Sequence, residues 1–315
     1  MIDMVTVGEA MASLRGPGPL RLGGTMRLSI AGAESNVAIG LARLGHRARW
    51  IGRVGDDEMG ALVVRTLRAE GVDTSSVFVD PDRATGLLLF ERRVSEIVRV
   101  SYYRSGSAGG ALTADDVLPA LDDGARLLHV TGVTLALGAK AVDCVVAAIR
   151  RARERGIVVS LDVNFRSRLW SATAARETLR PLIRGIDIMF ASEDELCLVA
   201  TDPAAGIDAA ALQLIADGVR DVVVKRGASG ADSYTSAGKF SVPARSVPVV
   251  DVVGAGDAFV AGYLSALLDD RVVTERVERG VTTAAFAVAR EGDWEGLPDR
   301  GDLHLLDAAE GTTIR

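Results

Sequence analysis

The chain has 315 residues, of which 48% are hydrophobic and 25% charged, and its formal net charge is −6 at pH 7. This length suits one large domain with a small addition, and the hydrophobic fraction is enough for a sizeable core. The negative charge argues against nucleic-acid binding, which needs a basic surface, and no run of about 18 apolar residues suggests a membrane span.

The cysteines and the start of the chain bear on the compartment. Cys144 and Cys197 lie in apolar helical patterns without metal-ligand spacing, and we interpret them as core residues. The chain begins with a strand-like segment, residues 2–10, and not with a basic stretch followed by an apolar signal region. We therefore expect a cytoplasmic protein without a disulfide framework.

Strand-like and helix-like segments alternate along most of the chain. Short apolar runs that suit strands buried on both faces occur at residues 2–10, 47–55, 125–132, 157–164, 186–192 and 219–227. Segments with helical periodicity occur at residues 56–71, 139–155, 172–184 and 209–217. This order predicts an α/β fold in which helices cover both faces of a mostly parallel sheet, and ligands bind at the carboxyl ends of the strands.

Two stretches, residues 14–30 and 85–104, break this alternation and are typical of hairpin strands, the second turning around Val94-Ser95-Glu96. We expect them to form a small β-sheet, built from about residues 12–30 and 85–104. This sheet would project from a single domain that spans residues 1–315, as a lid, a dimer surface or both.

The segment DVVGAGDAFV, residues 251–260, joins a valine-rich run, predicted to be a buried strand, to an apolar helix. The amides of Gly254, Ala255 and Gly256 would lie at the helix amino terminus, where free N–H groups and glycines without Cβ atoms suit an anion. Asp257 would either cap this helix or take part in chemistry there.

Three other segments carry polar residues at comparable junctions. Asn36 begins a predicted helix after the Gly32-Ala33 turn, where it would cap the helix or bind a polyol. Asn164 and Arg166 follow a strand, in a loop that is either solvated or ligand-binding. The third segment has Lys225, Gly227 and Gly230 at a hairpin-like turn between two strands.

Together these four segments resemble the ribokinase-like (PfkB) carbohydrate kinase family, over nearly the whole chain and in the family's order. The most specific of them is D-x-x-G-A-G-D-A-F, residues 251–259. The resemblance implies a Rossmann-like three-layer α/β/α fold with a small β-sheet lid. It also implies ATP as the phosphoryl donor, Mg²⁺ as the cofactor and a sugar hydroxyl as the acceptor.

The resemblance also implies residue roles. Asp257 would accept the proton of the attacking hydroxyl, and the Gly254–Gly256 amides would hold the transferred phosphoryl group. The nucleotide would lie by Asn164, Ser192, Lys225, Gly227 and Gly230. In the family's N-x-x-E element Glu195 is retained near the metal, whereas Ser192 replaces the asparagine. Asp251 fits the start of a monovalent-cation site, but valines follow it, and potassium stays unassigned.

The segment VSYYRSGSAGGAL, residues 100–112, resembles 2-keto-3-deoxygluconate kinases. A guanidinium at Arg104 would pair with the carboxylate of a sugar acid, which a neutral hexose lacks; alternatively Arg104 is a solvated arginine. The substrate-binding residues that this resemblance implies are Gly32, Ala33, Asn36, Phe90, Tyr102, Arg104, Arg166 and Asp293. Leu88 departs from the subgroup because a substrate tyrosine can stand there.

Three alternatives stay open at this point. The acceptor could be a related sugar acid or a neutral sugar such as fructose or ribose, and the protein could be a catalytically silent sugar-binding regulator on the same fold. The partner expected is a small sugar or sugar acid, with neither nucleic acid nor membrane, and apolar residues of the small sheet suggest a homodimer. The scattered histidines, His46, His129 and His304, support no metal site.

Overall fold

The structure is a computed structural model that describes residues 2–94, 97–202 and 204–307; the predicted turn at Ser95 and Glu96 lies outside these ranges. Its main element is a nine-stranded sheet with the order β13-β12-β11-β10-β9-β8-β1-β4-β5. The strands from β11 to β5 are parallel, and the hairpin β11–β12–β13 adds two antiparallel strands at one edge. The bounds are β1 Ile2–Val7, β4 Ala48–Gly55, β5 Val77–Asp80, β8 Ala125–Thr131, β9 Val158–Asp162, β10 Ile188–Ser192, β11 Asp221–Lys225, β12 Ala231–Thr235 and β13 Gly238–Val242.

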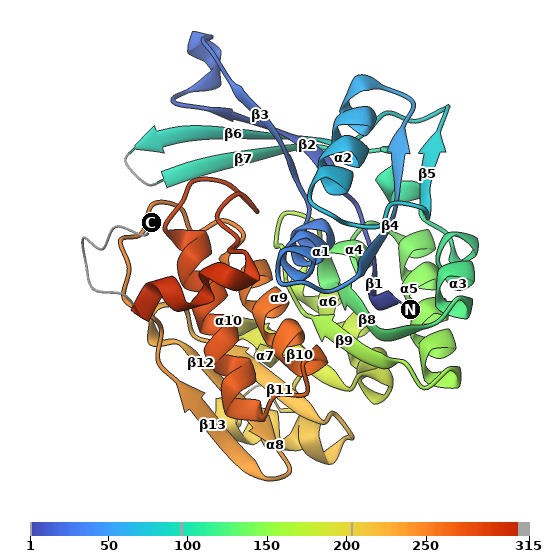
Figure 1. The fold of residues 1–315 in the computed structure, drawn as a ribbon. Helices are drawn as coiled ribbons and strands as arrows, with labels where there is room; N and C mark the ends of the chain where they lie inside the picture. The colour runs from blue at the N-terminus through green and yellow to red at the C-terminus, as the bar shows by residue number, and fades with distance from the viewer. Residues whose placement is uncertain (1, 95–96, 203, 308–315) are drawn as a thin grey trace.

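Helices cover both faces of this sheet, which gives three layers (Figure 1). One layer packs on the apolar cluster that includes Trp50 and Phe190, and its helices are α1 Ala33–Arg43, α2 Glu58–Ala69, α9 Ala255–Leu268 and α10 Val273–Val288. The other packs on the cluster that includes Val5 and Leu161, and its main helices are α3 Ala114–Asp122, α5 Ala139–Glu154, α6 Ala172–Leu179, α7 Glu193–Val199 and α8 Ile207–Ala216, with the short α4 Gly132–Leu135 nearby. Neighbouring strand residues alternate between the two clusters, as the pleat of a doubly covered sheet requires.

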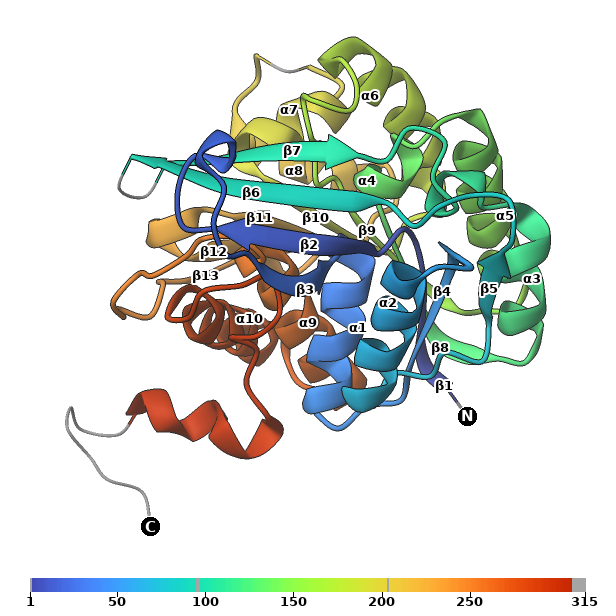
Figure 2. The same ribbon diagram turned by 90° about the horizontal axis from the view of Figure 1, so that it is seen from above.

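A second sheet of four strands has the order β3-β2-β6-β7 and is called here the small sheet. Its strands are β2 Met11–Gly16, β3 Arg27–Ala31, β6 Leu87–Val94 and β7 Ile97–Tyr103. The β2–β3 and β6–β7 pairs are antiparallel, and the two pairs join through a parallel β2–β6 contact. Figures 1 and 2 place the small sheet across the carboxyl ends of the large-sheet strands.

The predicted α/β fold with a mostly parallel sheet is confirmed, and two local predictions are wrong. Residues 172–184 are not one helix, because α6 ends at Leu179 and a 3₁₀ segment, Arg180–Gly185, follows it. The valine-rich run before α9 is not a buried strand: Val249, Val250 and Val252 are between 51% and 69% exposed. Here the backbone N–H groups of Val250 and Asp251 donate to the carbonyl of Val288 at the end of α10, and not to a neighbouring strand.

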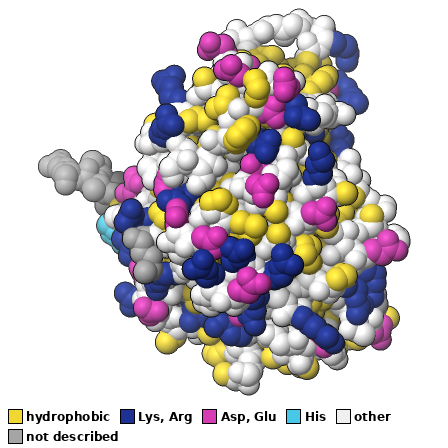
Figure 3. Space-filling model, turned by 90° about the vertical axis from the view of Figure 1, so that its right-hand side faces the viewer, with side chains coloured by type: hydrophobic (Ala, Val, Ile, Leu, Met, Phe, Trp, Pro, Cys, Tyr) yellow, Lys and Arg dark blue, Asp and Glu magenta, His cyan; other side chains and the backbone are white. Residues whose placement is uncertain are grey.

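The surface mixes charges of both signs. Figure 3 shows interspersed basic and acidic side chains on one face of the molecule. The ion pairs of Asp122 with Arg151 and Arg155 are an example of this mixing. Among the helices in the described part of the chain, none has both the length and the hydropathy required to cross a bilayer.

Candidate active site

Asp257 lies in the first turn of α9, at the edge of the large sheet that the small sheet covers. The helix begins after Gly254, which has φ +75°, so Gly254 and not Asp257 occupies the capping position. The Asp257 side chain is buried, with 6% of its surface exposed. A carboxylate in the first turn of a helix interacts favourably with the helix dipole.

Two asparagines hold this carboxylate from different elements. Asn36 of α1 donates its Nδ2–H to Asp257 Oδ2 over 2.8 Å, and Asn164, which follows β9, donates to Oδ1 over 3.2 Å. Asn164 has φ +38°, an uncommon conformation for a residue other than glycine. Neither asparagine caps a helix, so the capping alternative for Asn36 is wrong. The uncommon backbone conformation of Asn164 directs its side-chain amide toward Asp257.

The surroundings of Asp257 raise the pKa of its carboxyl above the ordinary value. Burial is the largest cause, and the charge of Asp162 adds to it. The hydrogen bond from Asn36 and the positive charges of Arg166 and Lys225 act in the opposite direction. A carboxylate with a raised pKa that two amides keep in one orientation is suited to accept a proton.

The turn before Asp257 brings backbone amides to the same place. A Cβ atom on Gly254 would overlap the backbone oxygen of Asp293, so the chain needs glycine here for space as well as for its positive φ. The nearest atom to a Cβ on Gly256 would be Lys225 Nζ, at 3.6 Å. The Ala255 amide makes only a long bond of 3.4 Å, to the Val252 carbonyl. These first-turn amides and the Lys225 ammonium suit an anionic group beside Asp257.

Lys225 stands at the end of β11 and pairs with Asp162 at the end of β9. Its Nζ lies 2.8 and 2.7 Å from the two Asp162 carboxylate oxygens. Burial alone would lower the pKa of Lys225, but the charges of Asp162 and Glu195 outweigh it, and the pKa is raised. Lys225 is therefore a fixed positive charge, whereas the sequence had suggested no partner for it.

Glu195 and Ser192 form the capping box of α7. The Glu195 amide donates to Ser192 Oγ over 3.2 Å, and the Ser192 amide donates to Glu195 Oε2 over 2.8 Å. Glu195 Oε1 accepts the Phe165 amide over 2.7 Å, which ties α7 to the loop that carries Asn164. No group of three metal-ligating side chains occurs within the described ranges. One carboxylate with free lone pairs does fit a Mg²⁺ ion whose other ligands are phosphate oxygens and water.

Arg104, at the end of β7, forms an ion pair with Glu9, and both side chains are buried. Ser107 also donates to the Glu9 carboxylate. The buried Nε of Arg104 has no hydrogen-bond partner, and the same is true of Asn36 Oδ1. Arg104 is thus not a solvated arginine. Buried donors without partners are rare in folded proteins, so they suggest a bound polar ligand.

Arg104 and Asn36 belong to the same region. Gly32 lies so close to the Glu9 backbone oxygen that a Cβ atom on Gly32 would clash with it. The backbone N–H of Asn36 donates to the Gly32 carbonyl over 2.8 Å. Ala33, the first residue of α1, lies between Gly32 and Asn36 in the chain. Tyr102 faces the Arg104 guanidinium, which lies 5.9 Å from the ring centroid. The predicted sugar residues of the small sheet and of α1 therefore lie next to each other.

Two further predicted sugar residues, Phe90 and Asp293, have a partner that the sequence did not suggest. Phe90 is 4% exposed, and the Arg15 guanidinium lies 4.0 Å from its ring centroid. Asp293 is 8% exposed, and its carboxylate forms an ion pair with the same guanidinium. Burial raises the pKa of Asp293 to about 6, although Arg15 opposes this shift.

The remaining predicted residues lie around the same edge of the large sheet. Gly227 and Gly230 make the turn between β11 and β12 with φ +53° and +93°. Arg166 is exposed and lies close enough to Asp257 to lower its pKa. Sequence reasoning placed Asp162 at this strand end without giving it a role, and it missed Glu9 and Arg15. Asp162 follows the same alternation as Asn164 and Arg166, whereas the partners of Glu9 and Arg15 are far along the chain.

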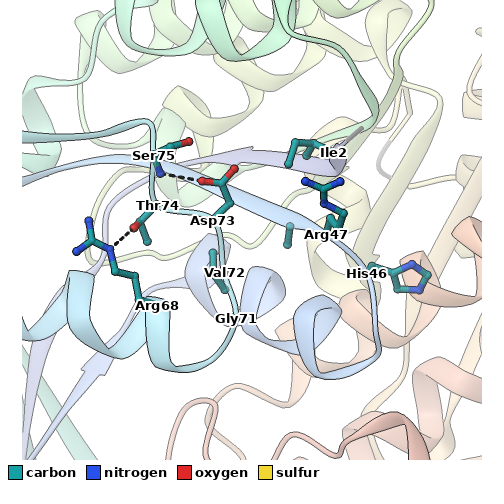
Figure 4. Close-up of a pocket in the computed structure, with 10 residues that line it drawn as sticks. Ile2, His46, Arg47, Arg68, Gly71, Val72, Asp73, Thr74 and Ser75 are labelled. Carbon is teal, nitrogen blue, oxygen red and sulfur yellow. Dashed lines mark hydrogen bonds between the residues drawn. The ribbon is translucent and has the colours of Figure 1, made fainter.

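A separate hollow of about 520 Å³ lies at the amino ends of β1, β4 and β5, where the strands begin (Figure 4). Arg68 donates to Thr74 there over 2.8 Å. The residues around Asp257 lie at the carboxyl ends of the strands, so this hollow does not belong to the site.

Comparison with known proteins agrees with this geometry. The chain is 38% identical to "2-dehydro-3-deoxygluconokinase" of Thermoproteus tenax, with 97% of this chain and 94% of that protein covered. It is 36% identical to the protein of the same name from Bacillus subtilis, with 99% and 97% covered. A "putative Ribokinase II in complex with ATP and Mg+2 from E.coli" has a TM-score of 0.91 at 27% identity, over 98% of this chain and 99% of that one.

The family model described as "pfkB family carbohydrate kinase" matches residues 1–300. Its match spans the small sheet, the Asn36 helix, the Lys225 hairpin and the turn at Gly254. The resemblance seen in the sequence is thereby confirmed: the chain belongs to the pfkB family of carbohydrate kinases.

Proposed function

We propose that this chain is an ATP-dependent kinase that phosphorylates a hydroxyl of a sugar acid, with 2-keto-3-deoxygluconate as the acceptor. The two relatives named 2-dehydro-3-deoxygluconokinase support the acceptor. The observation that carries the reaction is the buried Asp257 carboxylate beside the first-turn amides of α9, held by Asn36 and Asn164. The observation that favours an acid acceptor is the buried Arg104 guanidinium, whose Nε–H lacks a partner.

In the proposed reaction Asp257 takes the proton of the sugar hydroxyl while the hydroxyl oxygen bonds to the γ-phosphorus of ATP. The bond between that phosphorus and the β,γ-bridging oxygen breaks, and ADP leaves. The transition state spreads negative charge over the equatorial phosphoryl oxygens, and the amides of Gly254, Ala255 and Gly256 would stabilise it. Lys225 would add positive charge close to Gly256, 3.6 Å from the position of a Cβ there.

We assign the nucleotide to the side of the site formed by Asn164, Ser192, Lys225 and the Gly227–Gly230 turn. The solved structure with ATP and Mg²⁺ supports the use of both by a protein of this fold. Mg²⁺ would neutralise the charge of the nucleotide phosphates, and Glu195 is the carboxylate that would hold it or its water. We assign the reaction to the cytoplasm, where ATP is available.

On the sugar side, we assign Gly32, Ala33 and Asn36 to the hydroxyls, and Arg104 with Tyr102 to the carboxylate end. Arg166 lies on the phosphate side of Asp257. Because Glu9 already neutralises one edge of Arg104, a substrate carboxylate would use the remaining N–H groups of the guanidinium. Phe90 would not contact the sugar through the ring face that Arg15 covers.

The deciding experiment measures ADP release with ATP and Mg²⁺ across several acceptors: 2-keto-3-deoxygluconate, its galactonate epimer, fructose, ribose and adenosine. A kcat/KM that is highest for one of the two acids supports the proposal. A preference for fructose or ribose would assign a neutral sugar, and turnover of none of them would favour a sugar-binding regulator.

We also propose that two copies of the chain pair through their small sheets. Leu28 of β3 and Tyr103 of β7 are 46% and 61% exposed, and Leu22 nearby is 74% exposed. Apolar side chains on one small surface favour burial against another protein surface. Light scattering of the purified protein should give the mass of a dimer, and Leu28→Glu should give that of a monomer; a wild-type monomer would contradict the pairing.

A further inference from the structure

Arg15 is a buried arginine on the small sheet whose partners belong to two loops of the main domain. Its side chain is 8% exposed. One terminal nitrogen lies 2.9 Å from Asp251 Oδ2, and the other pairs with Asp293. Asp251 precedes α9 and Asp293 follows α10, so a single guanidinium connects three segments that lie far apart in the chain.

Both aspartates contact the turn that precedes Asp257, Asp251 through its carboxylate and Asp293 through its backbone. Asp251 Oδ1 accepts the Val253 amide over 3.1 Å, and its Oδ2 accepts the Gly292 amide over 3.3 Å. The backbone oxygen of Asp293 lies directly against the Cα of Gly254. Without a cation between them, two buried carboxylates repel each other, and the loops that carry them would separate.

We propose that Arg15 is a positioning residue for phosphoryl transfer: it fixes the Gly254–Gly256 amides against the small sheet in the arrangement that receives the phosphoryl group. Arg15 does not touch the reacting atoms in this scheme. It acts through Asp251 on Val253 and through Asp293 on Gly254. The inference rests on the kinase reaction proposed above and is independent of which sugar is the acceptor.

The guanidinium has the geometry that this role needs. Its planar fork can donate to two carboxylates at once, whereas the single ammonium of a lysine is a point charge. Phe90 packs under the fork, at 4.0 Å from the ring centroid to the guanidinium carbon, and limits its rotation. Arg15 of β2 is directly opposite Phe90 of β6, so the strand register of the small sheet fixes the position of the guanidinium relative to the Phe90 ring.

The test compares kcat and KM of Arg15→Lys, Arg15→Gln and Arg15→Ala with the wild type, using whichever acceptor the wild type phosphorylates. Since a small misplacement of groups that bind the transition state costs up to about 100-fold, we expect kcat to fall about 10- to 100-fold in Arg15→Gln. KM for ATP and for the sugar should change little, and Arg15→Lys should be intermediate. Millimolar guanidinium chloride, but not sodium chloride, should restore part of kcat to Arg15→Ala.

Arg27→Gln is the matched control. Arg27 lies directly opposite Arg15 in the β2–β3 pair and also reaches the loop after α10, through Glu295 at 2.8 Å. It is 47% exposed, and we expect wild-type kcat from it. Unchanged kcat in both Arg15→Lys and Arg15→Gln would overturn the proposal. So would a loss that follows the melting temperature of each variant and that guanidinium does not restore. A wild type that is inactive on 2-keto-3-deoxygluconate but active on another sugar would reject only the acceptor.

Discussion

Asp257→Asn is the change that tests the proposed chemistry most directly. The substitution keeps the shape of the side chain and removes its ability to take a proton. Losing a general base typically lowers turnover by about 10²- to 10⁴-fold, which corresponds to about 3–5 kcal/mol in the activation free energy. We expect a kcat loss of this size at saturating ATP and sugar.

The structure indicates that the Asp257→Asn variant should still fold. The oxygen of the introduced amide can accept one of the two bonds that the carboxylate now receives, at 2.8 Å from Asn36 and 3.2 Å from Asn164. The introduced NH₂ group then faces the other asparagine, which costs about 1–3 kcal/mol. Removing a buried charge whose pKa burial has raised offsets part of this cost. The melting temperature should therefore change little.

The assay couples ADP release to a spectroscopic readout, and nucleotide affinity is measured separately by calorimetry. Nucleotide affinity should stay near the wild-type value, because the role proposed for Asp257 is toward the acceptor and not toward the nucleotide. Asp217→Asn is the control, since Asp217 is an exposed aspartate at the end of α8. Turnover of Asp257→Asn near the wild-type rate would refute the assignment of the base.

Three further outcomes are expected. Arg104→Ala should raise KM for a sugar acid far more than KM for fructose. The comparison is made in a Glu9→Gln background, so that no buried carboxylate is left unpaired. Equal increases in both KM values would mean that Arg104 supports the fold and does not bind the substrate carboxylate. Gly254→Ala should lower the unfolding free energy in denaturant by more than the roughly 1–2 kcal/mol of a left-handed conformation, because its Cβ meets the Asp293 backbone, whereas Gly256→Ala should stay near the wild-type stability. Burial lowers the pKa of His129 to about 3, so the unfolded chain binds a proton that the folded chain does not as pH falls below 6.5. From this group alone the unfolding free energy should fall by up to about 1.4 kcal/mol per pH unit between pH 6.5 and 3, and His129→Asn should flatten that slope; an unchanged slope would contradict it.

The parts of the fold that follow local patterns could be predicted from the sequence. The strands of the large sheet are continuous apolar runs, and Gly71 closes α2 with φ +78° where the pattern predicted an end. The valine-rich run before α9 has the composition of a strand but pairs with no strand in the described ranges. Its amides are taken by the end of α10, which no local pattern reveals.

The residues of the candidate site could likewise be predicted only in part. Asp257, Asn36 and Asn164 could be predicted to share one edge, because each follows a strand or begins a helix at that edge. The partners of Arg104 and Arg15 could not, since Glu9 and Asp293 are 95 and 278 residues away along the chain. Ion pairs between residues so far apart depend on how the small sheet packs on the main domain, and the spacing of residues in the sequence does not reveal this packing.

Two of the chain connections between the small sheet and the main domain are very short. Three residues connect β1 to β2, and Gly32 alone connects β3 to α1, the helix that carries Asn36. Any tilt of the small sheet would therefore turn the first turn of α1 and change the 2.8 Å bond from Asn36 to Asp257. That bond lowers the pKa of the carboxyl, so the position of the small sheet and the basicity of Asp257, the proposed base, are mechanically linked.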